Sequence, residues 1–260
     1  MAESAVDNSL QQKIEIRHES QHDLVLSSSA KRQDLVQELA TKLKNGIPSD
    51  WQPFNPDVTG SSDSFVDNVN NPRFFLKQRW YMGDFRDAKI FDASLANAAN
   101  SITNEIALSP RIKEILTSKQ GRKLASSHGL DKIVFVEPLV GIVNRNTQQK
   151  ALAYEFIDAV PAASESDYEI VNGRAVPSKG SDLEKITDLT KALRQIFYEH
   201  GIIATDLYPQ QIMRSKDGKI AYLLDAETYY REQSVISAKL PTNSGRRRIL
   251  GFLNKIANRG

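Results

Sequence analysis

The chain has 260 residues, about 40% of them hydrophobic and 25% charged, which is enough to bury the core of one two-lobed domain or of two small ones. Its formal charge of +2 does not point to nucleic acid or an anionic membrane as the main partner. The absence of cysteine excludes a disulfide framework, a thiolate zinc site and a cysteine nucleophile. No run approaches the roughly 18 apolar residues of a membrane span, and the N-terminus lacks the apolar core of a signal peptide. We expect a soluble, cytoplasmic protein, with the cytoplasm of a host cell after secretion as the alternative.

The N-terminal fifty residues look like an appendage. The first thirty are rich in Ser, Gln and Asn and hold few large apolar groups, so we expect them to stay mobile. Between residues 31 and 45 the apolar positions fall on one face of a helix that ends before Gly46; they are Leu35, Val36, Leu39 and Leu43. We therefore predict that residues 1–50 form a mobile extension with one short helix.

Residues 51–160 have mainly strand character. Bulky residues follow a turn signal and form the first hairpin, and later apolar runs supply further strands; the relevant ranges are 58–69, 73–80, 132–136 and 150–157. Residues 94–108 have helical spacing, and we expect Ser109-Pro110 to end that helix. This pattern predicts an N-terminal lobe built on five antiparallel strands and a helix.

Residues 161–260 begin with a loop rich in turn-forming residues. The following helix, 181–200, opens with a capping box in which Ser181 precedes Glu184 by three positions. A short strand at Ile212-Met213, a turn and the strand 219–224 come next, and a basic amphipathic helix is expected at 245–257. The chain as a whole is therefore predicted to be α+β.

One ordered series of residues carries chemistry. The predicted helix ends at His200-Gly201, Asp206 follows with Pro209 and Gln211 behind it, and after a tight hairpin Asp225 ends an apolar strand. This series resembles the catalytic loop and metal-binding segment of protein kinases, with Gln211 where the family has Asn. The resemblance implies a protein-kinase-like two-lobed fold with a truncated, mostly helical C-terminal lobe.

The resemblance also implies roles for these residues. Asp206 would orient or deprotonate the acceptor hydroxyl, and Asp225 would bind Mg²⁺. Gln211 would be the second magnesium ligand through its carbonyl oxygen, or a failed one. The alternative is that Asp206 and Asp225 only stabilise turns, which is the commonest use of aspartate in loops.

Weaker matches lie upstream, in the order that the family uses. The segment Gly60, Ser61 and Ser62 resembles a degraded glycine-rich loop over the phosphates of ATP, and Lys77 stands where a kinase places its phosphate-binding lysine. The alternatives are a plain hairpin tip and a lysine that faces outward from its strand.

Two further positions complete the predicted ATP site. Glu105 would be the helix glutamate that fixes Lys77, with Glu114 as the second choice and a solvated helix charge as the alternative. The main chain at Glu155 and Ile157 resembles the segment between the lobes that binds adenine.

The chain departs from the family after Asp225, which is followed by Ala-Glu instead of Phe-Gly. The segment Ala204-Thr205-Asp206 likewise replaces His-Arg-Asp, and the C-terminal tail is short. This truncation resembles minimal bacterial kinases, including secreted effector kinases and the kinase-like PhoP regulatory network family. The basic residues Arg246, Arg247 and Arg248 would then meet an acidic or phosphorylated partner, or form the solvated face of a packing helix.

These residues together favour an ATP-dependent phosphotransferase that acts on a hydroxyl, namely an atypical minimal serine/threonine protein kinase of bacterial effector or regulatory type. ATP and Mg²⁺ are the expected cofactors, with a protein substrate or partner, no nucleic acid and no membrane span. A catalytically impaired pseudokinase that acts as a binding module and a small-molecule kinase are the alternatives.

Overall fold

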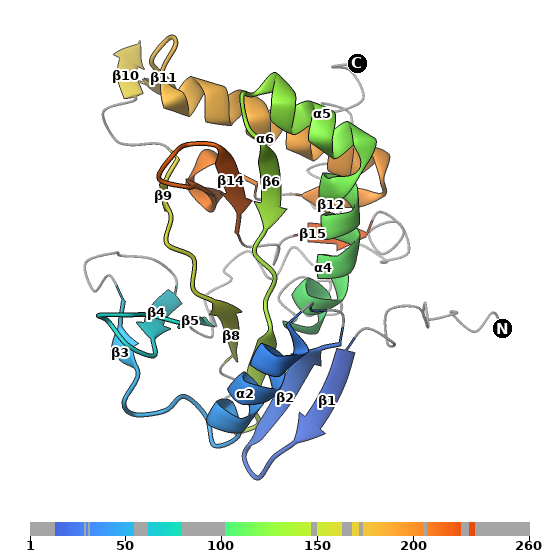
Figure 1. Ribbon diagram of the computed structural model, residues 1–260, viewed down its shortest axis with the longest axis vertical. Coiled ribbons are helices and arrows are strands. Elements are labelled where there is room, and N and C mark those ends of the chain that lie inside the picture. The colour runs from blue at the N-terminus through green and yellow to red at the C-terminus, as the bar shows by residue number, and fades with distance from the viewer. Residues whose placement is uncertain are drawn as a thin grey trace, which may run out of the picture. The chain divides into compact units, whose positions relative to one another are not determined.

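The computed structural model (Figure 1) describes residues 14–28, 30, 32–54, 62–79, 102–146, 150–162, 168–171, 174–204, 207–224 and 229–231. The chain separates into two compact units, which we describe one at a time. The first unit contains residues 1–82, 101–111 and 136–157, and the second contains residues 83–100, 112–135 and 158–260.

The first unit is built on a seven-stranded antiparallel sheet with the strand order β1-β2-β7-β8-β5-β4-β3. The strands are β1 (Ile14–His18), β2 (His22–Ser27), β3 (Gln52–Pro53), β4 (Ser62–Val66), β5 (Phe74–Arg79), β7 (Val140–Asn144) and β8 (Lys150–Glu155).

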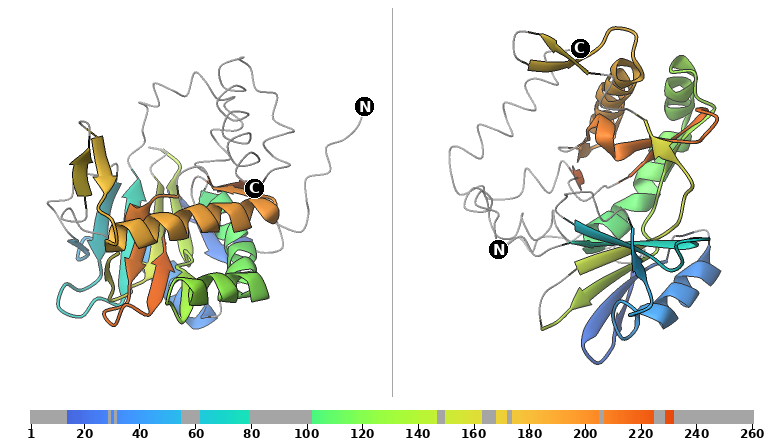
Figure 2. Two further views of the ribbon diagram at one scale, coloured as in Figure 1. Left: turned by 90° about the horizontal axis from the view of Figure 1, so that it is seen from above. Right: turned by 90° about the vertical axis from the view of Figure 1, so that its left-hand side faces the viewer.

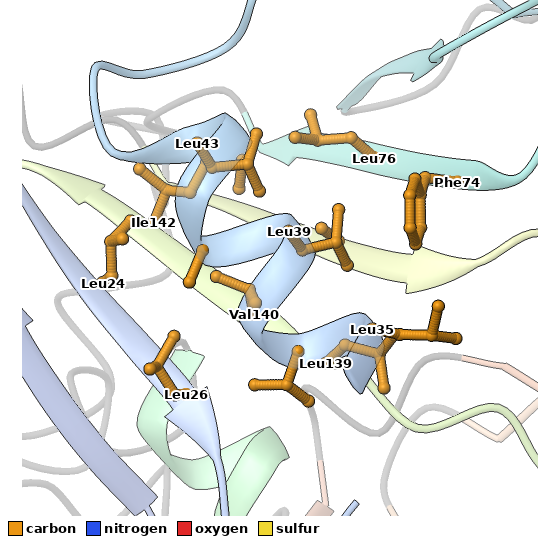
Figure 3. Packing of buried hydrophobic residues seen from close by; sticks show 14 of the residues in the cluster. Leu24, Leu26, Leu35, Leu39, Leu43, Phe74, Leu76, Leu139, Val140 and Ile142 are labelled. Atoms are coloured by element: carbon orange, nitrogen blue, oxygen red, sulfur yellow. The ribbon is translucent and has the colours of Figure 1, made fainter. Parts of the chain in front are cut away.

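Helix α2 (Gln33–Leu43) covers one face of this sheet (Figure 3). Its residues Leu35, Leu39 and Leu43 recur at helical spacing, are at most 1% exposed and point toward the sheet. The sheet residues that meet them come from four strands and the approach to β7, and include Leu24, Leu26, Phe74, Leu76, Leu139, Val140 and Ile142. The structure confirms the helix that the apolar spacing predicted.

The prediction that residues 1–50 form a mobile extension is wrong for the part from residue 14 onward. Strand β2 lies inside the sheet between β1 and β7, and its Leu24 and Leu26 are 0% and 1% exposed. The sheet accordingly has seven strands instead of five. The apolar run of β2 is short, and its burial depends on pairing with β7, which lies more than a hundred residues later.

Helix α4 (Ile102–Thr117) continues through Pro110, so the prediction that Ser109-Pro110 ends a helix is also wrong. A proline inside a helix costs about 3 kcal/mol. Fully buried apolar residues on both sides of Pro110 offset that cost, among them Ile106, Leu108 and Ile112.

The second unit combines helices with short strands. Its main sheet has the order β6-β14-β13-β9, in which β6 and β14 are parallel and the other neighbours are antiparallel. The strands are β6 (Lys132–Phe135), β9 (Val160–Pro161), β13 (Ile212–Arg214) and β14 (Ile220–Leu223); two further pairs join β10 (Tyr168–Val171) to β11 (Arg174–Pro177) and β12 (Ile202–Ala204) to β15 (Tyr229–Arg231). The two-stranded β10-β11 hairpin lies where the sequence predicted a loop.

Helices α5 (Lys119–Ser127) and α6 (Asp182–Glu199) lie side by side in this unit (Figures 1 and 2). Gln120 Nε2 of α5 donates to Glu199 Oε2 of α6 over 2.6 Å. The Ser181 hydroxyl accepts from the N–H of Glu184 at 3.1 Å, as the capping box predicted, and Gly201 ends α6 with φ +73°.

The structure thus confirms the α+β class. Among the residues it describes, no helix has both the length and the hydropathy needed to cross a membrane.

Candidate functional site

Lys77 lies on the face of the first unit's sheet that is opposite to α2. In the register of β5 with β8, Phe75 pairs with Tyr154 and Lys77 pairs with Leu152. Side chains alternate along a strand, so these four share one face, whereas Leu76 points to the α2 core. The sheet pairing therefore places a lysine beside apolar neighbours and away from the main core.

Glu105, in the first turn of α4, is fully buried on this same face. The Tyr154 hydroxyl donates to Glu105 Oε1 at 3.1 Å, and Tyr154 itself is only 6% exposed. A buried carboxylate is costly unless hydrogen bonds or a cation compensate it. Lys77 lies two positions from Phe75 along β5, a separation of about 7 Å. Phe75 pairs with Tyr154, so the long side chain of Lys77 can span the distance to the Tyr154–Glu105 contact. The ion pair between Lys77 and Glu105 itself stays a prediction.

Glu114, the second choice as a lysine partner, lies on an exposed part of α4. Because the carboxylate of Glu105 is the one buried on the Lys77 face, the geometry favours Glu105 for this role.

The predicted phosphate loop is described only at its end. Gly60 and Ser61 lie outside the described residues, and Ser62 begins β4 opposite Arg79. Val66, at the other end of β4, pairs with Phe75 and is fully buried on the Lys77 face. The described part of this hairpin therefore adds an apolar wall beside Lys77.

The segment predicted to bind adenine follows β8. The side chain of Glu155 is exposed and lies 3.6 Å from the Arg32 guanidinium, and Ile157 is partly buried. The N–H of Phe156, between them, donates to the carbonyl of Arg73 at 2.9 Å. Any role of Glu155 and Ile157 in binding a base therefore falls to their main-chain groups.

In the second unit, α6 holds the predicted catalytic loop. Arg194 of α6 donates to the Leu207 carbonyl, and its guanidinium lies 5.1 Å from the centre of the Tyr208 ring. Leu207 is fully buried, and Gln211 ends a short 3-10 helix, η2 (Pro209–Gln211), with its N–H donating to the Tyr208 carbonyl at 3.0 Å. These contacts give the segment 207–211 a defined conformation.

Gln211 carries an unusual polar atom. Its Oε1 is buried and accepts no hydrogen bond from any residue in the described ranges. Its main-chain carbonyl accepts from the N–H of Leu224 at 2.9 Å, which ties the loop to the end of β14. An unsatisfied buried amide oxygen costs about 1–3 kcal/mol. A hard cation would satisfy it, so Gln211 fits the role of a magnesium ligand.

Asp206 and Asp225 lie outside the described residues, as do Arg246, Arg247 and Arg248. The described residues that flank the two acidic positions are held by hydrogen bonds. Ala204 pairs with Tyr229 between β12 and β15, and Leu224 is bonded to Gln211. Within the ranges that are described, no group of three or more His, Asp or Glu residues could hold a metal ion.

Sequence reasoning missed two residues of this site. The contact of Tyr154 with Glu105 joins two elements that are far apart in the chain, and no local pattern indicates it. Arg194 lies on α6, where a single arginine in a helical pattern indicates only an ordinary surface charge.

No protein-family model and no curated protein matches this sequence. Among solved structures, the chain is similar to a kinase of Cydia pomonella granulovirus, with 9% identity and a TM-score of 0.37 over 76% of this chain and 60% of that one. It is also similar to a rhoptry kinase of Toxoplasma gondii, with 12% identity and a TM-score of 0.32 over 84% of this chain and 50% of that one. This chain thus spans no more than 60% of the length of either kinase.

Proposed function

We propose that the protein is an ATP-dependent phosphotransferase that acts on a hydroxyl group. The observation that carries the proposal is the placement of Lys77 on the sheet face where the carboxylate of Glu105 is buried. A lysine held by a buried carboxylate is a fixed cation, and phosphoryl transfer needs such a cation beside the phosphates.

In this proposal Lys77 binds the α- and β-phosphates of ATP, and Glu105 orients Lys77. The main chain of Gly60, Ser61 and Ser62 lies over the phosphates. The main-chain groups of Glu155 and Ile157 bind adenine.

Gln211 and Asp225 would hold Mg²⁺, which supplies neutralising charge to the phosphate oxygens when bound. The support for Gln211 is its buried, unsatisfied Oε1. Asp206 accepts the proton of the attacking hydroxyl. The hydroxyl oxygen bonds to the γ-phosphorus as the bond between that phosphorus and the bridging oxygen breaks, and ADP leaves.

The finer class that we propose is an atypical minimal serine/threonine protein kinase of bacterial effector or regulatory type. Its support is the basic run that follows Asp225, in which Arg246, Arg247 and Arg248 would contact an acidic or phosphorylated partner. The replacement of Asn by Gln211 favours a second candidate, a catalytically impaired pseudokinase that binds a partner. A kinase for a small molecule is the third candidate, because the loop that begins at Asp206 would serve the hydroxyl of a small molecule equally well.

The first test is a thermal-shift measurement with ATP in the presence and absence of Mg²⁺. We expect ATP with Mg²⁺ to raise the Tm by several degrees, and Lys77→Ala to abolish that rise. Lys132→Ala, which removes an exposed strand lysine in the other unit, is the matched control and should leave the rise unchanged. A Tm that does not change on addition of ATP, or a rise in Tm that persists in the Lys77→Ala variant, would contradict the proposal.

The second test separates catalysis from binding. Transfer of labelled phosphate from ATP to the protein itself or to generic protein substrates should disappear in Asp225→Asn and persist in Asp188→Asn, which alters an exposed aspartate of α6. Nucleotide binding without any transfer to protein or metabolite hydroxyls would favour the pseudokinase. Transfer to metabolites alone would favour the small-molecule kinase.

A further inference from the structure

Strand β1 (Ile14–His18) forms one edge of the first unit's sheet (Figure 1). It pairs with β2 along its whole length, from Ile14 opposite Ser27 to His18 opposite Asp23. Among the described residues, no strand pairs with the other side of β1. An edge strand presents unpaired N–H and C=O groups, to which a further strand can bond.

The main-chain hydrogen bonds of β2 alternate between its two neighbours. The N–H of Glu19 donates to the carbonyl of His22, so His22 turns its main-chain polar groups toward β1. The N–H of Ser27 donates to the carbonyl of Leu139 just before β7, so Ser27 turns them the other way. Because this direction alternates along a strand, the even-numbered residues of β2 bond toward β1.

The same alternation decides which groups of β1 lie at its open edge. Glu15 and Arg17 are the partners of even-numbered residues of β2, so their N–H and C=O groups point into the sheet. The N–H and C=O groups of Ile14, Ile16 and His18 therefore point outward, away from β2.

The outward groups of β1 are complementary to those of a second copy of the strand. In an antiparallel pair of two β1 strands centred on Ile16, each Ile16 exchanges both main-chain hydrogen bonds with its copy. Ile14 does the same with His18 of the second copy. Every outward donor and acceptor of the two strands is then used.

The charged side chains of β1 favour this same register. Glu15 lies opposite Arg17 of the second copy and Arg17 opposite Glu15, at the positions where two antiparallel backbones are closest. Both side chains are partly exposed, and Arg17 already donates to Glu15 at 2.7 Å within the chain. A shift of one strand by two residues would instead place Glu15 opposite Glu15, or Arg17 opposite Arg17.

Ile16 supplies an apolar contact at the centre of the pair. Its side chain is 49% exposed, whereas that of its neighbour Val25 on β2 is 3% exposed. In the centred register the two Ile16 side chains lie next to each other and shield one another from water.

We propose that two copies of this chain associate through β1, as an antiparallel pair of strands with a twofold axis at Ile16. The sheets of the two first units then form one continuous sheet, and an isologous contact of this kind closes at two copies. Interfaces below about 1,200 Å² are typical of weak, reversible complexes, and one strand a side is a small interface. The dimer therefore depends on protein concentration, and it does not depend on whether the chain transfers phosphate.

The experiment is sedimentation equilibrium of the full chain at concentrations from about ten micromolar to one millimolar, where weak complexes form. The wild type should show a reversible equilibrium of monomer and dimer. Ile16→Lys places two ammonium groups at the twofold axis and should weaken the dimer at least about tenfold. Val69→Lys is the matched control, because Val69 is 51% exposed and lies in the loop before β5, and it should leave the equilibrium unchanged.

Two charge reversals test the register. Glu15→Lys and Arg17→Glu each place like charges opposite one another in the homodimer, so each should weaken it by about tenfold. An equimolar mixture of these two variants should dimerise as well as the wild type, because each strand then meets opposite charges on the other. The double variant Glu15→Lys/Arg17→Glu should also dimerise as the wild type does.

Circular dichroism and the Tm of each variant check that it is folded. A wild type that stays monomeric over this range of concentration, or a dimer that persists in folded Ile16→Lys, would overturn the proposal. So would an equimolar mixture of the two charge variants that dimerises as weakly as either variant alone.

Discussion

The hydroxyl of Tyr154 donates a 3.1 Å hydrogen bond to Oε1 of Glu105, and both groups are buried. This contact joins strand β8 to helix α4 on the sheet face that carries Lys77. It makes Tyr154 a positioning residue for the carboxylate that we propose orients Lys77.

Tyr154→Phe removes this hydrogen bond and keeps the ring. We expect the free energy of unfolding to fall by about 1–2 kcal/mol, because a buried carboxylate oxygen loses a donor. If the proposed function is right, phosphate transfer falls about tenfold as well. Urea denaturation measures the first effect and a transfer assay the second.

Tyr222→Phe is the matched control for that substitution, because the Tyr222 hydroxyl has no hydrogen bond among the residues described. It should change the unfolding free energy by less than about 0.5 kcal/mol. Equal stability losses in the two variants would remove the special role assigned to Tyr154.

Arg194→Leu should loosen the predicted catalytic loop. The substitution removes the donor to the Leu207 carbonyl and the cation over the Tyr208 ring, and we expect a loss of about 1–2 kcal/mol. Hydrogen exchange should accelerate at the Gln211 amide, which bonds to Tyr208. Lys191→Leu, at an exposed position of the same helix, is the control, and similar exchange in both variants would contradict the prediction.

Gly201→Ala should destabilise the end of α6. At φ +73° an alanine is strained, and no atom lies within 4 Å of a Cβ at this position, so the cost is conformational and about 1 kcal/mol. Gly201→Asn should cost less, because asparagine tolerates this conformation better. An alanine variant as stable as wild type in urea would show that the turn is not left-handed in solution.

The Glu199 carboxylate should contribute to the acid sensitivity of the second unit. Hydrogen bonds from Gln195 and then Gln120 lower its pKa. A carboxyl whose pKa is lower in the folded state stabilises the protein above its unfolded pKa, about 4.3, and this contribution is lost as the pH falls through the folded value. The group is exposed, so the effect is at most a few tenths of a kcal/mol.

Glu199→Gln should therefore flatten the decrease in unfolding free energy between about pH 5 and pH 3. Gln195→Ala, which removes the main donor, should flatten it partially. If the unfolding free energy of Glu199→Gln decreased with falling pH as steeply as that of the wild type, the lowered pKa would not belong to Glu199.

Sequence patterns correctly predicted the helices and strands whose ends are determined by residues close to them in the chain. Helix α6 begins at its capping serine and ends before Gly201, within a residue of the range expected from the sequence. Strands β5 and β8 were found because each is a short apolar run bounded by turn residues. Strands β1 and β2 were missed, because the polar composition of the first thirty residues indicated a mobile segment and the burial of β2 depends on its distant partner β7.

The site was predictable in its residue types and less so in its geometry. The pairing of Lys77 with Leu152 and of Phe75 with Tyr154 puts Lys77 and Tyr154 on one face, and this depends on a register that no single strand reveals. Such features need the folded chain.

The pairing of Leu24 with Ile142 across β2 and β7 has a consequence for synthesis of the protein. On the ribosome β2 emerges long before its inner neighbour, and at usual elongation rates it waits on the order of ten seconds. During that interval its leucines are open to chaperones and proteases. Nascent chains arrested before residue 140 emerges should be cleaved within β2, whereas chains that have exposed β8 should be protected.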